Sequence, residues 1–325
     1  MTQKSIKYFL LIDIGGTKLR SAIGDSTGNI IESVEDYTSI KDGATGALNK
    51  IFDLSDEVMK LSGIDRHLIA KISISFGGPV NFDKKQIIRS QHIQGWNNFP
   101  LCEHLTKRYH IPAVIDNDGN VTALGEYTFG AGKGSKSMLY LTVSTGVGGG
   151  IILNGKVRHG KNNLAGEIGH IIVEENGLLC ECGKKGCVEG YSSGYAIGKN
   201  AQNYFKKYKK SKSKVLNLVQ GDLEKITAIT IYRAADQGDR VAKKMVDESI
   251  RKLAIAIANT ICVLDVDKIV IGGGITHEKG LFFKPLQKYV DQFAMFKEPY
   301  HVPIVRARYK DEAGLKGCIA LALNL

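Results

Sequence analysis

Residues 8–24 read Y-F-L-L-I-D-I-G-G-T-K-L-R-S-A-I-G, an apolar run, a glycine turn and a second apolar run. Short apolar runs bounded by glycine predict two β-strands joined by a tight turn. A further turn at residues 25–29 and a third run from Ile30 extend the pattern. The chain is therefore predicted to open on a three-stranded meander.

The same pattern returns in the middle of the chain. Residues 138–144 are apolar and lead into T-G-V-G-G-G, a predicted strand at 151–153 and an Asn154-Gly155 hairpin turn. Helices and strands are predicted to alternate after each meander: helix 44–61, strands 72–76 and 113–116 and helix 120–127, then helices 195–206 and 240–263 and strand 268–271. This repetition predicts two α/β domains related by internal duplication, with a cleft between them. We expect one domain over 1–117, with a helix at 313–325 packing back on it, and a second over 118–312.

The composition is that of an ordinary globular protein. The chain has 325 residues, of which 43% are hydrophobic and 24% charged, which is enough for two cored domains. The first apolar run, residues 8–14, is short and contains Asp13, so we expect neither a secretion signal nor a membrane span there. We expect a cytoplasmic protein.

The net charge of +11 would suit an anionic ligand or a nucleic acid. Its densest block is K-K-Y-K-K-S-K-S-K at residues 206–214. We interpret this block as a solvated loop after a helix, because no stacking motif for nucleic acid accompanies it.

The segment 166–189 gathers metal ligands. It reads G-E-I-G-H, nine further residues, then C-E-C-G-K-K-G-C-V-E. Thiolate and imidazole are zinc ligands, so His170, Cys180, Cys182 and Cys187 predict a closed, structural Cys3His site with no position for a catalytic water. The alternative is a disulfide cluster or scattered buried thiols; we favour zinc because the other three cysteines are isolated in the sequence.

Three glycine-rich turns follow predicted strands. D13-I-G-G-T-K18 and S144-T-G-V-G-G-G150 can each offer uncovered backbone N–H groups to phosphate oxygens. Neither has the spacing of a P-loop or of a dinucleotide fingerprint. A plain hairpin is the alternative for the first turn, whereas two such turns facing one cleft would bracket a polyphosphate. The third, I271-G-G-G-I275, lies at a strand end where α/β sheets bind ligands.

The motif I115-D-N-D-G-N120 lies between a predicted strand and a predicted helix. A carboxylate at such a strand end can accept a hydroxyl proton, which makes Asp118 the candidate general base. Asp116 or Asp118 could equally be the N-cap of the helix. The residues alone leave both alternatives open.

Together these ordered motifs resemble the ROK family (repressor, open reading frame, kinase) over nearly the whole chain. The resemblance implies the duplicated, ribonuclease H-like two-domain fold of actin and hexokinase, and phosphorylation of a hexose or N-acetylhexosamine by ATP with magnesium. It makes Asp118 the base and implies sugar contacts at Gly78, Asn117, Glu167, His170 and Glu189, with His170 serving zinc and sugar by one ring nitrogen each. Contacts to ATP and magnesium are expected at Asp13, Gly15, Gly16, Thr17, Lys18, Thr145, Gly146, Gly272 and Gly273. The F76-G-G-P79 segment departs from the apolar-G-x-P-G run of many members.

We therefore expect an ATP-dependent hexose kinase, with glucose as the substrate on family frequency. An N-acetylmannosamine or N-acetylglucosamine kinase is the near alternative, because the pocket beside the sugar 2-position decides between hydroxyl and acetamide. A polyphosphate donor and a non-catalytic sugar-binding protein are less favoured. A repressor of this family would need a DNA-binding domain, for which the residues before Asp13 leave no room. Proteins that resemble this one are commonly homodimers.

Overall fold

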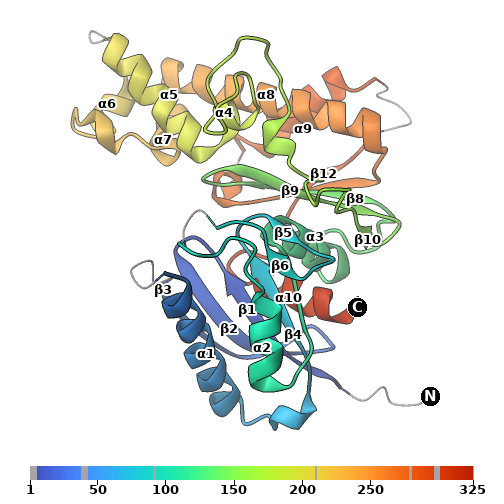
Figure 1. Cartoon of the computed structure of the whole chain (residues 1–325). Coiled ribbons are helices and arrows are strands. Elements are labelled where there is room, and N and C mark those ends of the chain that lie inside the picture. The colour runs from blue at the N-terminus through green and yellow to red at the C-terminus, as the bar shows by residue number, and fades with distance from the viewer. Residues whose placement is uncertain are drawn as a thin grey trace. The chain divides into compact units, whose positions relative to one another are not determined.

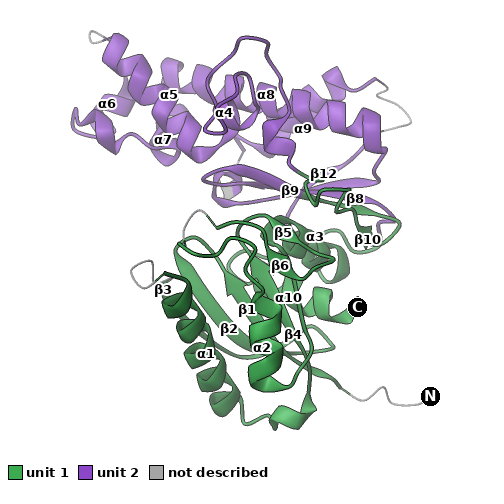
Figure 2. Ribbon diagram, in the orientation of Figure 1, with its two compact units in different colours: residues 1–134, 150–166, 308–325 green, residues 135–149, 167–307 purple. Residues whose placement is uncertain are grey.

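A computed structural model of the chain describes residues 6–37, 43–90, 93–208, 211–277, 280–295 and 301–324. Figure 1 shows the elements in chain order. The chain divides into two compact units, one of residues 1–134, 150–166 and 308–325 and one of residues 135–149 and 167–307 (Figure 2). Within the described ranges, none of the helices combines the length and the apolar character needed to cross a membrane.

The sheet of the first unit has the strand order β3-β2-β1-β4-β7. Its strands are β1 (Tyr8–Ile14), β2 (Lys18–Asp25), β3 (Ile30–Tyr37), β4 (Ile69–Phe76) and β7 (Ala113–Asn117). β1 pairs with β2 in the antiparallel sense and with β4 in the parallel sense. Residues 9–12 of β1 are all buried, as expected for a central strand that is covered on both faces.

Helices cover both faces of this sheet. Helix α1 (Gly43–Ser62) places Ile51 in one buried cluster with Leu10 and Ile12 of β1. On the other face, a Cβ at Gly24 would touch both Leu11 of β1 and Ile319 of α10 (Ala313–Leu323). Since successive strand residues point to opposite faces, α10 packs on the face opposite to α1.

Two glycines let α10 approach α3 (Asp118–Thr128) very closely. A Cβ on Gly125 of α3 would lie 2.8 Å from Cα of Gly317 in α10. A Cβ on Gly317 would lie 2.6 Å from the carbonyl carbon of Val121. A larger residue at either position would push the two helices apart.

The buried carboxylate of Glu126 ties the end of α3 to the chain that enters α10. It accepts hydrogen bonds from the backbone N–H groups of Ala131 (2.8 Å), Arg308 (3.1 Å) and Tyr309 (2.8 Å). Charge-assisted bonds to a buried carboxylate are stronger than neutral ones. Glu126 thereby fixes the path of residues 308–309 relative to α3.

The second five-stranded sheet repeats the order of the first. Its order is β10-β9-β8-β11-β12, from β8 (Met138–Val143), β9 (Val147–Leu153), β10 (Lys156–Val157), β11 (Lys268–Gly272) and β12 (Ile304–Arg306). In both sheets the order along the chain is third, second, first, fourth and fifth. The predicted duplicated α/β fold is therefore confirmed.

The remaining elements complete the two units. They are α2 (Leu101–Tyr109), β5 (Val80–Asn81) and β6 (Gln86–Ile87) in the first unit, and α4 (Glu189–Ser192), α5 (Gly194–Lys207), α6 (Lys214–Leu218), α7 (Ala228–Asp236), α8 (Arg240–Leu264) and α9 (Phe283–Phe293) in the second. Four 3-10 turns lie at Arg66–Leu68, Ile168–His170, Leu223–Lys225 and Gly274–His277. Asp239 is the N-cap of the long helix α8, and its carboxylate accepts hydrogen bonds from the Val241 and Ala242 N–H groups.

Two expectations differ from the structure in detail. Strand β9 begins at Val147 rather than near residue 151, so three of the four glycines of the second turn lie inside a strand. The reason is close packing, since a Cβ on Gly150 would lie 2.7 Å from Cβ of Ala123 on α3. Within the basic block 206–214, residues 206–207 end α5 and Lys214 begins α6, while residues 209–210 lie outside the described residues.

The domain boundary between residues 117 and 118 stays a prediction. β7 and α3, which meet at that point, belong to one compact unit. The chain passes between the units after residues 134, 149, 166 and 307.

Candidate functional site

The turn from β7 to α3 presents the candidate base. Asn117 is the N-cap of α3, and its side-chain oxygen accepts the Gly119 N–H at 2.9 Å. The alternative in which Asp116 or Asp118 is the N-cap is therefore wrong. Asp118 is the first residue of the helix and is exposed. Its carboxylate therefore lies at the positive end of the helix dipole.

Asp116 is hydrogen-bonded to residues on both sides of Asp118. The carboxylate is buried and accepts hydrogen bonds from the Asn117 N–H (2.7 Å) and the Asn120 side chain (3.0 Å). Its other oxygen lies 2.7 Å from Nε2 of His159, whose ring stacks on Phe82 at 4.1 Å. The sequence does not predict this contact with His159, because a single histidine 43 positions away carries no spacing signal.

The segment after β4 closes around the same turn. The Asn117 side-chain N–H donates to the Gly78 carbonyl oxygen at 3.0 Å. A Cβ on Gly77 would lie 3.6 Å from Oδ2 of Asp118 and 3.8 Å from Cα of Gly15. The first unit thus brings together the predicted contacts Gly15, Gly78, Asn117 and Asp118.

The first glycine turn joins β1 to β2. It is closed by a 2.9 Å bond from the Gly15 N–H to the Lys18 carbonyl, and residues 16–18 are exposed. Lys18 pairs with Glu35 through Nζ and Oε1 at 2.8 Å, with both side chains about half exposed. A cavity of 360 Å³ lies beside Lys18 and Glu35. The turn therefore presents backbone N–H groups and one exposed cation.

Asp13 lies at the end of β1 beneath this turn. Burial raises the pKa of its carboxyl group, and the positive charge of Arg20 opposes that shift. A Cβ on Gly314, near the start of α10, would lie 2.6 Å from Cγ of Asp13. Gly314 is a residue that the sequence does not predict, because its role depends on the packing of α10 against β1.

The second glycine turn is occupied by a protein carboxylate. Oε2 of Glu189 accepts the Val147 N–H at 2.9 Å and would lie 2.9 Å from a Cβ on Gly146. The predicted phosphate turn and a predicted sugar contact therefore touch each other. A cavity of 180 Å³ is lined by both, together with Thr145 and Cys180.

The third glycine cluster ends β11 beside this turn. Gly273 has a φ of +95°, and a Cβ on it would lie 2.6 Å from the carbonyl carbon of Val143 at the end of β8. A Cβ on Gly274 would meet Oγ of Ser144 at 3.9 Å. Gly273 and Gly274 therefore lie beside Val143 and Ser144 in the second unit.

The four predicted zinc ligands come together. The ligand atoms of His170, Cys180, Cys182 and Cys187 all lie within 4.8 Å of one another. Sγ of Cys182 is 3.7 Å from Sγ of Cys187, and Sγ of Cys180 is 3.9 Å from Nδ1 of His170. A tetrahedral site with Zn–S bonds of ~2.3 Å separates its ligand atoms by ~3.8 Å. All six cysteines are free thiols, so the disulfide alternative is wrong and the donor set fits zinc.

Tight turns shape the loop around the metal ligands. Gly183 and Gly186 have φ angles of +84° and +80°. Gly177 is needed for a different reason, because a Cβ there would overlap the Tyr191 hydroxyl. Burial raises the pKa of the Cys180 thiol to about 12, so zinc binding by its thiolate releases a proton.

The predicted sugar contacts of the second unit lie next to the predicted zinc ligands. Nδ1 of His170 faces Cys180, and its Nε2 lies 3.9 Å from Oε2 of Glu167. Oε1 of Glu189 lies 3.5 Å from Sγ of Cys180. Glu167, His170 and Glu189 therefore lie around one cluster of candidate metal ligands, with one imidazole nitrogen turned away from the thiols.

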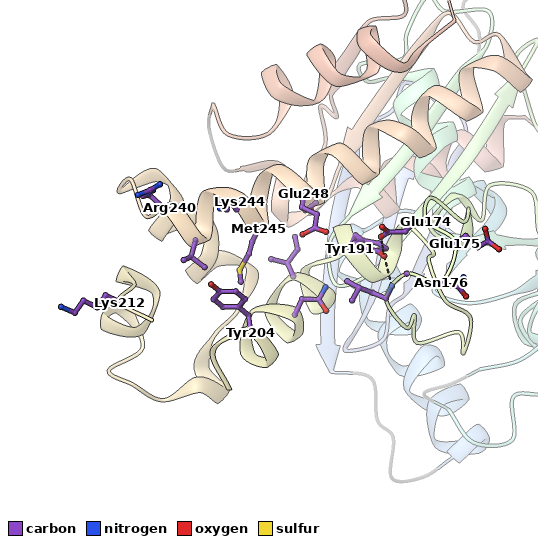
Figure 3. A pocket seen from close by; sticks show the side chains of 16 residues that line it. Glu174, Glu175, Asn176, Tyr191, Tyr204, Lys212, Arg240, Lys244, Met245 and Glu248 are labelled. Carbon is purple, nitrogen blue, oxygen red and sulfur yellow. Dashed lines mark hydrogen bonds between the residues drawn. The ribbon is translucent and has the colours of Figure 1, made fainter. Parts of the chain in front are cut away.

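A larger cavity of 880 Å³ lies elsewhere in the second unit (Figure 3). Figure 3 shows Glu174, Glu175 and Tyr191 at one end and Lys212 and Arg240 at the other. None of the predicted site residues lines it. Cavity size alone would therefore point away from the residues that the motifs identify.

Comparison with known proteins places these residues in a family context. Residues 9–324 match the model of the ROK family. A glucokinase of Halalkalibacterium halodurans is 37% identical over 90% of this chain and 87% of its own length. An N-acetylmannosamine kinase of Yersinia pseudotuberculosis is 30% identical over 95% of this chain and 96% of its own. The structure of a Streptomyces griseus glucokinase in complex with glucose and AMPPNP superposes with a TM-score of 0.79, with 31% identity over 99% of this chain and 100% of that one.

Proposed function

We propose that this chain, which belongs to the ROK family, is a sugar kinase that transfers the γ-phosphoryl group of ATP to a hydroxyl of a hexose. The substrate we propose is glucose and the product glucose 6-phosphate. Support comes from the 37% identity to a glucokinase and from the likeness to a glucokinase that binds glucose and AMPPNP. We also propose that the protein is located in the cytoplasm and that it forms a homodimer.

The exposed carboxylate of Asp118 is the observation that carries this proposal. Because Asn117 caps α3, Asp118 is not needed as the cap. An ionised carboxylate at this position can take the proton from the attacking sugar hydroxyl as the oxygen bonds to phosphorus. Buried Asp116 restricts the movement of the turn, so the base is preorganised.

We assign sugar contacts within each unit separately. In the first unit, Gly78 and the side chain of Asn117 form one hydrogen-bonded pair beside Asp118. In the second unit, Glu167, His170 and Glu189 offer carboxylate and imidazole groups to sugar hydroxyls. His170 would hold zinc through Nδ1 and leave Nε2 for the sugar, so that bound zinc would fix the orientation of this sugar ligand.

The donor is bound by backbone groups of the glycine turns. We assign the donor contacts to Gly15, Gly16, Thr17 and Lys18 of the first unit and to Thr145, Gly146, Gly272 and Gly273 of the second. Oxygen donors suit Mg²⁺, and the carboxylate of Asp13 is the group we assign to it. Magnesium, when bound, neutralises charge on the phosphates.

An N-acetylmannosamine kinase is the second candidate function. The 30% identity to such an enzyme over 95% of the chain favours it over other sugars. A carboxylate and histidine set can hold either ring, so the acetamide group at the 2-position is what separates the two candidates.

Initial rates on a panel of sugars test the proposal. The panel consists of glucose, mannose, fructose, N-acetylglucosamine and N-acetylmannosamine, each with Mg-ATP and with polyphosphate as donor. We expect the highest kcat/KM for glucose with ATP. A preference for N-acetylmannosamine would select the second candidate, and no turnover of any sugar with either donor would refute the kinase.

A further inference from the structure

The zinc loop (residues 170–187) is held at a second point that involves none of the four metal ligands. The Tyr191 hydroxyl donates a hydrogen bond to Oε2 of Glu174 and accepts the Leu178 N–H at 2.8 Å. One phenol therefore joins two positions of the loop. Figure 3 shows Glu174 and Tyr191 at one end of the 880 Å³ cavity.

A buried cation completes this arrangement. Lys252 of α8 has a side chain that is only 9% exposed, and its Nζ lies 3.0 Å from Oε2 of Glu174. The same Nζ lies 5.1 Å above the ring of Tyr191. The Tyr191 hydrogen bond, together with Lys252, lowers the pKa of Glu174 below its usual range. We call Glu174, Tyr191 and Lys252 the clamp.

The clamp gains its strength from Lys252. Glu174 is 44% exposed, and an ion pair between two exposed groups contributes little to stability. A buried ammonium differs, because leaving it without a carboxylate is costly. The Glu174–Lys252 ion pair therefore stabilises the contact between the loop and α8.

A short path leads from the clamp to the candidate sugar site. Tyr191 lies on α4, the one-turn helix that begins with Glu189. The Ser192 hydroxyl on the same helix donates to the Ser249 carbonyl of α8 at 2.7 Å. At the other end of α4, Glu189 accepts the Val147 N–H. The orientation of Glu189 thus depends on how α4 sits on α8.

We propose that Lys252 is a positioning residue for Glu189, acting through Glu174 and Tyr191 from the side of the loop away from zinc. This inference rests on the proposed function, in which Glu189 contacts the sugar. Zinc fixes the ligands at one side of the loop, and the clamp fixes α4 at the other. Loss of the clamp therefore weakens sugar binding while zinc and donor binding persist.

The test uses Lys252→Met, which keeps the length of the side chain and removes its charge, and Tyr191→Phe, which removes one oxygen. Lys244→Met is the matched control, because Lys244 is exposed on the same helix and lines the cavity that Glu174 and Tyr191 also line. For each full-length, zinc-loaded protein we measure bound zinc, KM for sugar, KM for ATP and amide hydrogen exchange of residues 171–190.

Both clamp variants are expected to retain zinc and to raise KM for sugar by about 10-fold. A 1 Å misplacement of a positioning group can cost ~10²-fold, and we expect a smaller effect because the clamp acts on Glu189 indirectly. KM for ATP should rise much less than KM for sugar, because Glu189 makes a single hydrogen bond to the second glycine turn. Exchange in the loop should accelerate. The control should match wild type in every measurement.

Wild-type sugar KM and wild-type loop exchange in both clamp variants would overturn the inference, and so would equal rises in both KM values. If Lys252→Met does not fold, Tyr191→Phe decides alone. If the wild-type protein phosphorylates no sugar, the proposed function fails, and loop exchange still decides whether the clamp exists.

Discussion

Replacing Gly314 by alanine would place a methyl group against Asp13, the carboxylate that we assign to the donor site. The added Cβ would lie 2.6 Å from Cγ of Asp13, whereas ordinary contacts begin at 3.4 Å. Oδ2 of Asp13 would lie closer still, so one of the two groups must move by at least 0.8 Å (3.4 − 2.6). The helix is poorly placed to yield, because Gly317 already packs against the backbone of Val121 and Leu315 is buried.

We therefore expect Asp13 to move. A misplacement of about 1 Å in a positioning group can lower the rate ~10²-fold, which corresponds to about 2.7 kcal/mol of transition-state stabilisation. The loss should appear in kcat/KM for ATP. Sugar affinity should persist, since Asn117 and Asp118 lie at the end of another strand.

Steady-state kinetics with ATP and sugar varied in turn, and a thermal melt, check this expectation. Glu312→Ala is the control, because its side chain is exposed and the change adds no atom beside Asp13. Glycine to alanine inside a helix normally stabilises by ~1 kcal/mol, so a lower Tm in Gly314→Ala would show that the clash outweighs propensity. A folded variant with wild-type kcat/KM for ATP would refute the role of Asp13.

Three further predictions follow from the candidate site. Asp118→Asn should lower kcat by about 10²-fold or more and leave sugar affinity nearly unchanged, and wild-type turnover would leave the reaction without a base. Elemental analysis of the wild type should show about one zinc per chain, and Cys182→Ser should release it. The variant should lose most of its activity while it still binds ATP. A fully active wild type without zinc would contradict this prediction. Gly16→Ala should raise KM for ATP alone, whereas Gly146→Ala should raise KM for both substrates because its Cβ would touch Glu189; equal effects of the two variants on sugar KM would count against the assignment.

Features that depend on short sequence distances were predictable. His170, Cys180, Cys182 and Cys187 lie on one short segment, and ligand chemistry alone groups them. The two meanders and the long helix α8 follow from the apolar periodicity of the chain, which is a strong signal. The fold class could therefore be predicted without knowledge of any tertiary contact.

Features that depend on contacts between distant segments were not predictable. Gly314 approaches Asp13, and His159 reaches Asp116, only after the sheet and its helices have packed. The start of β9 was misplaced for a related reason, since glycine normally marks a turn but Gly150 serves the close approach of α3. No local pattern encodes such packing.

The position of α10 has a consequence for synthesis on the ribosome. The last strand of the first unit's sheet ends at Asn117. The helix α10, which covers one face of that sheet, begins only at Ala313, 196 residues later (313 − 117). At ~5–20 residues per second, that interval lasts roughly 10–40 s. Throughout it the growing polypeptide carries an uncovered apolar surface formed by some of its earliest residues. Nascent chains of this protein should therefore depend on chaperones that shield such surfaces until translation is nearly complete.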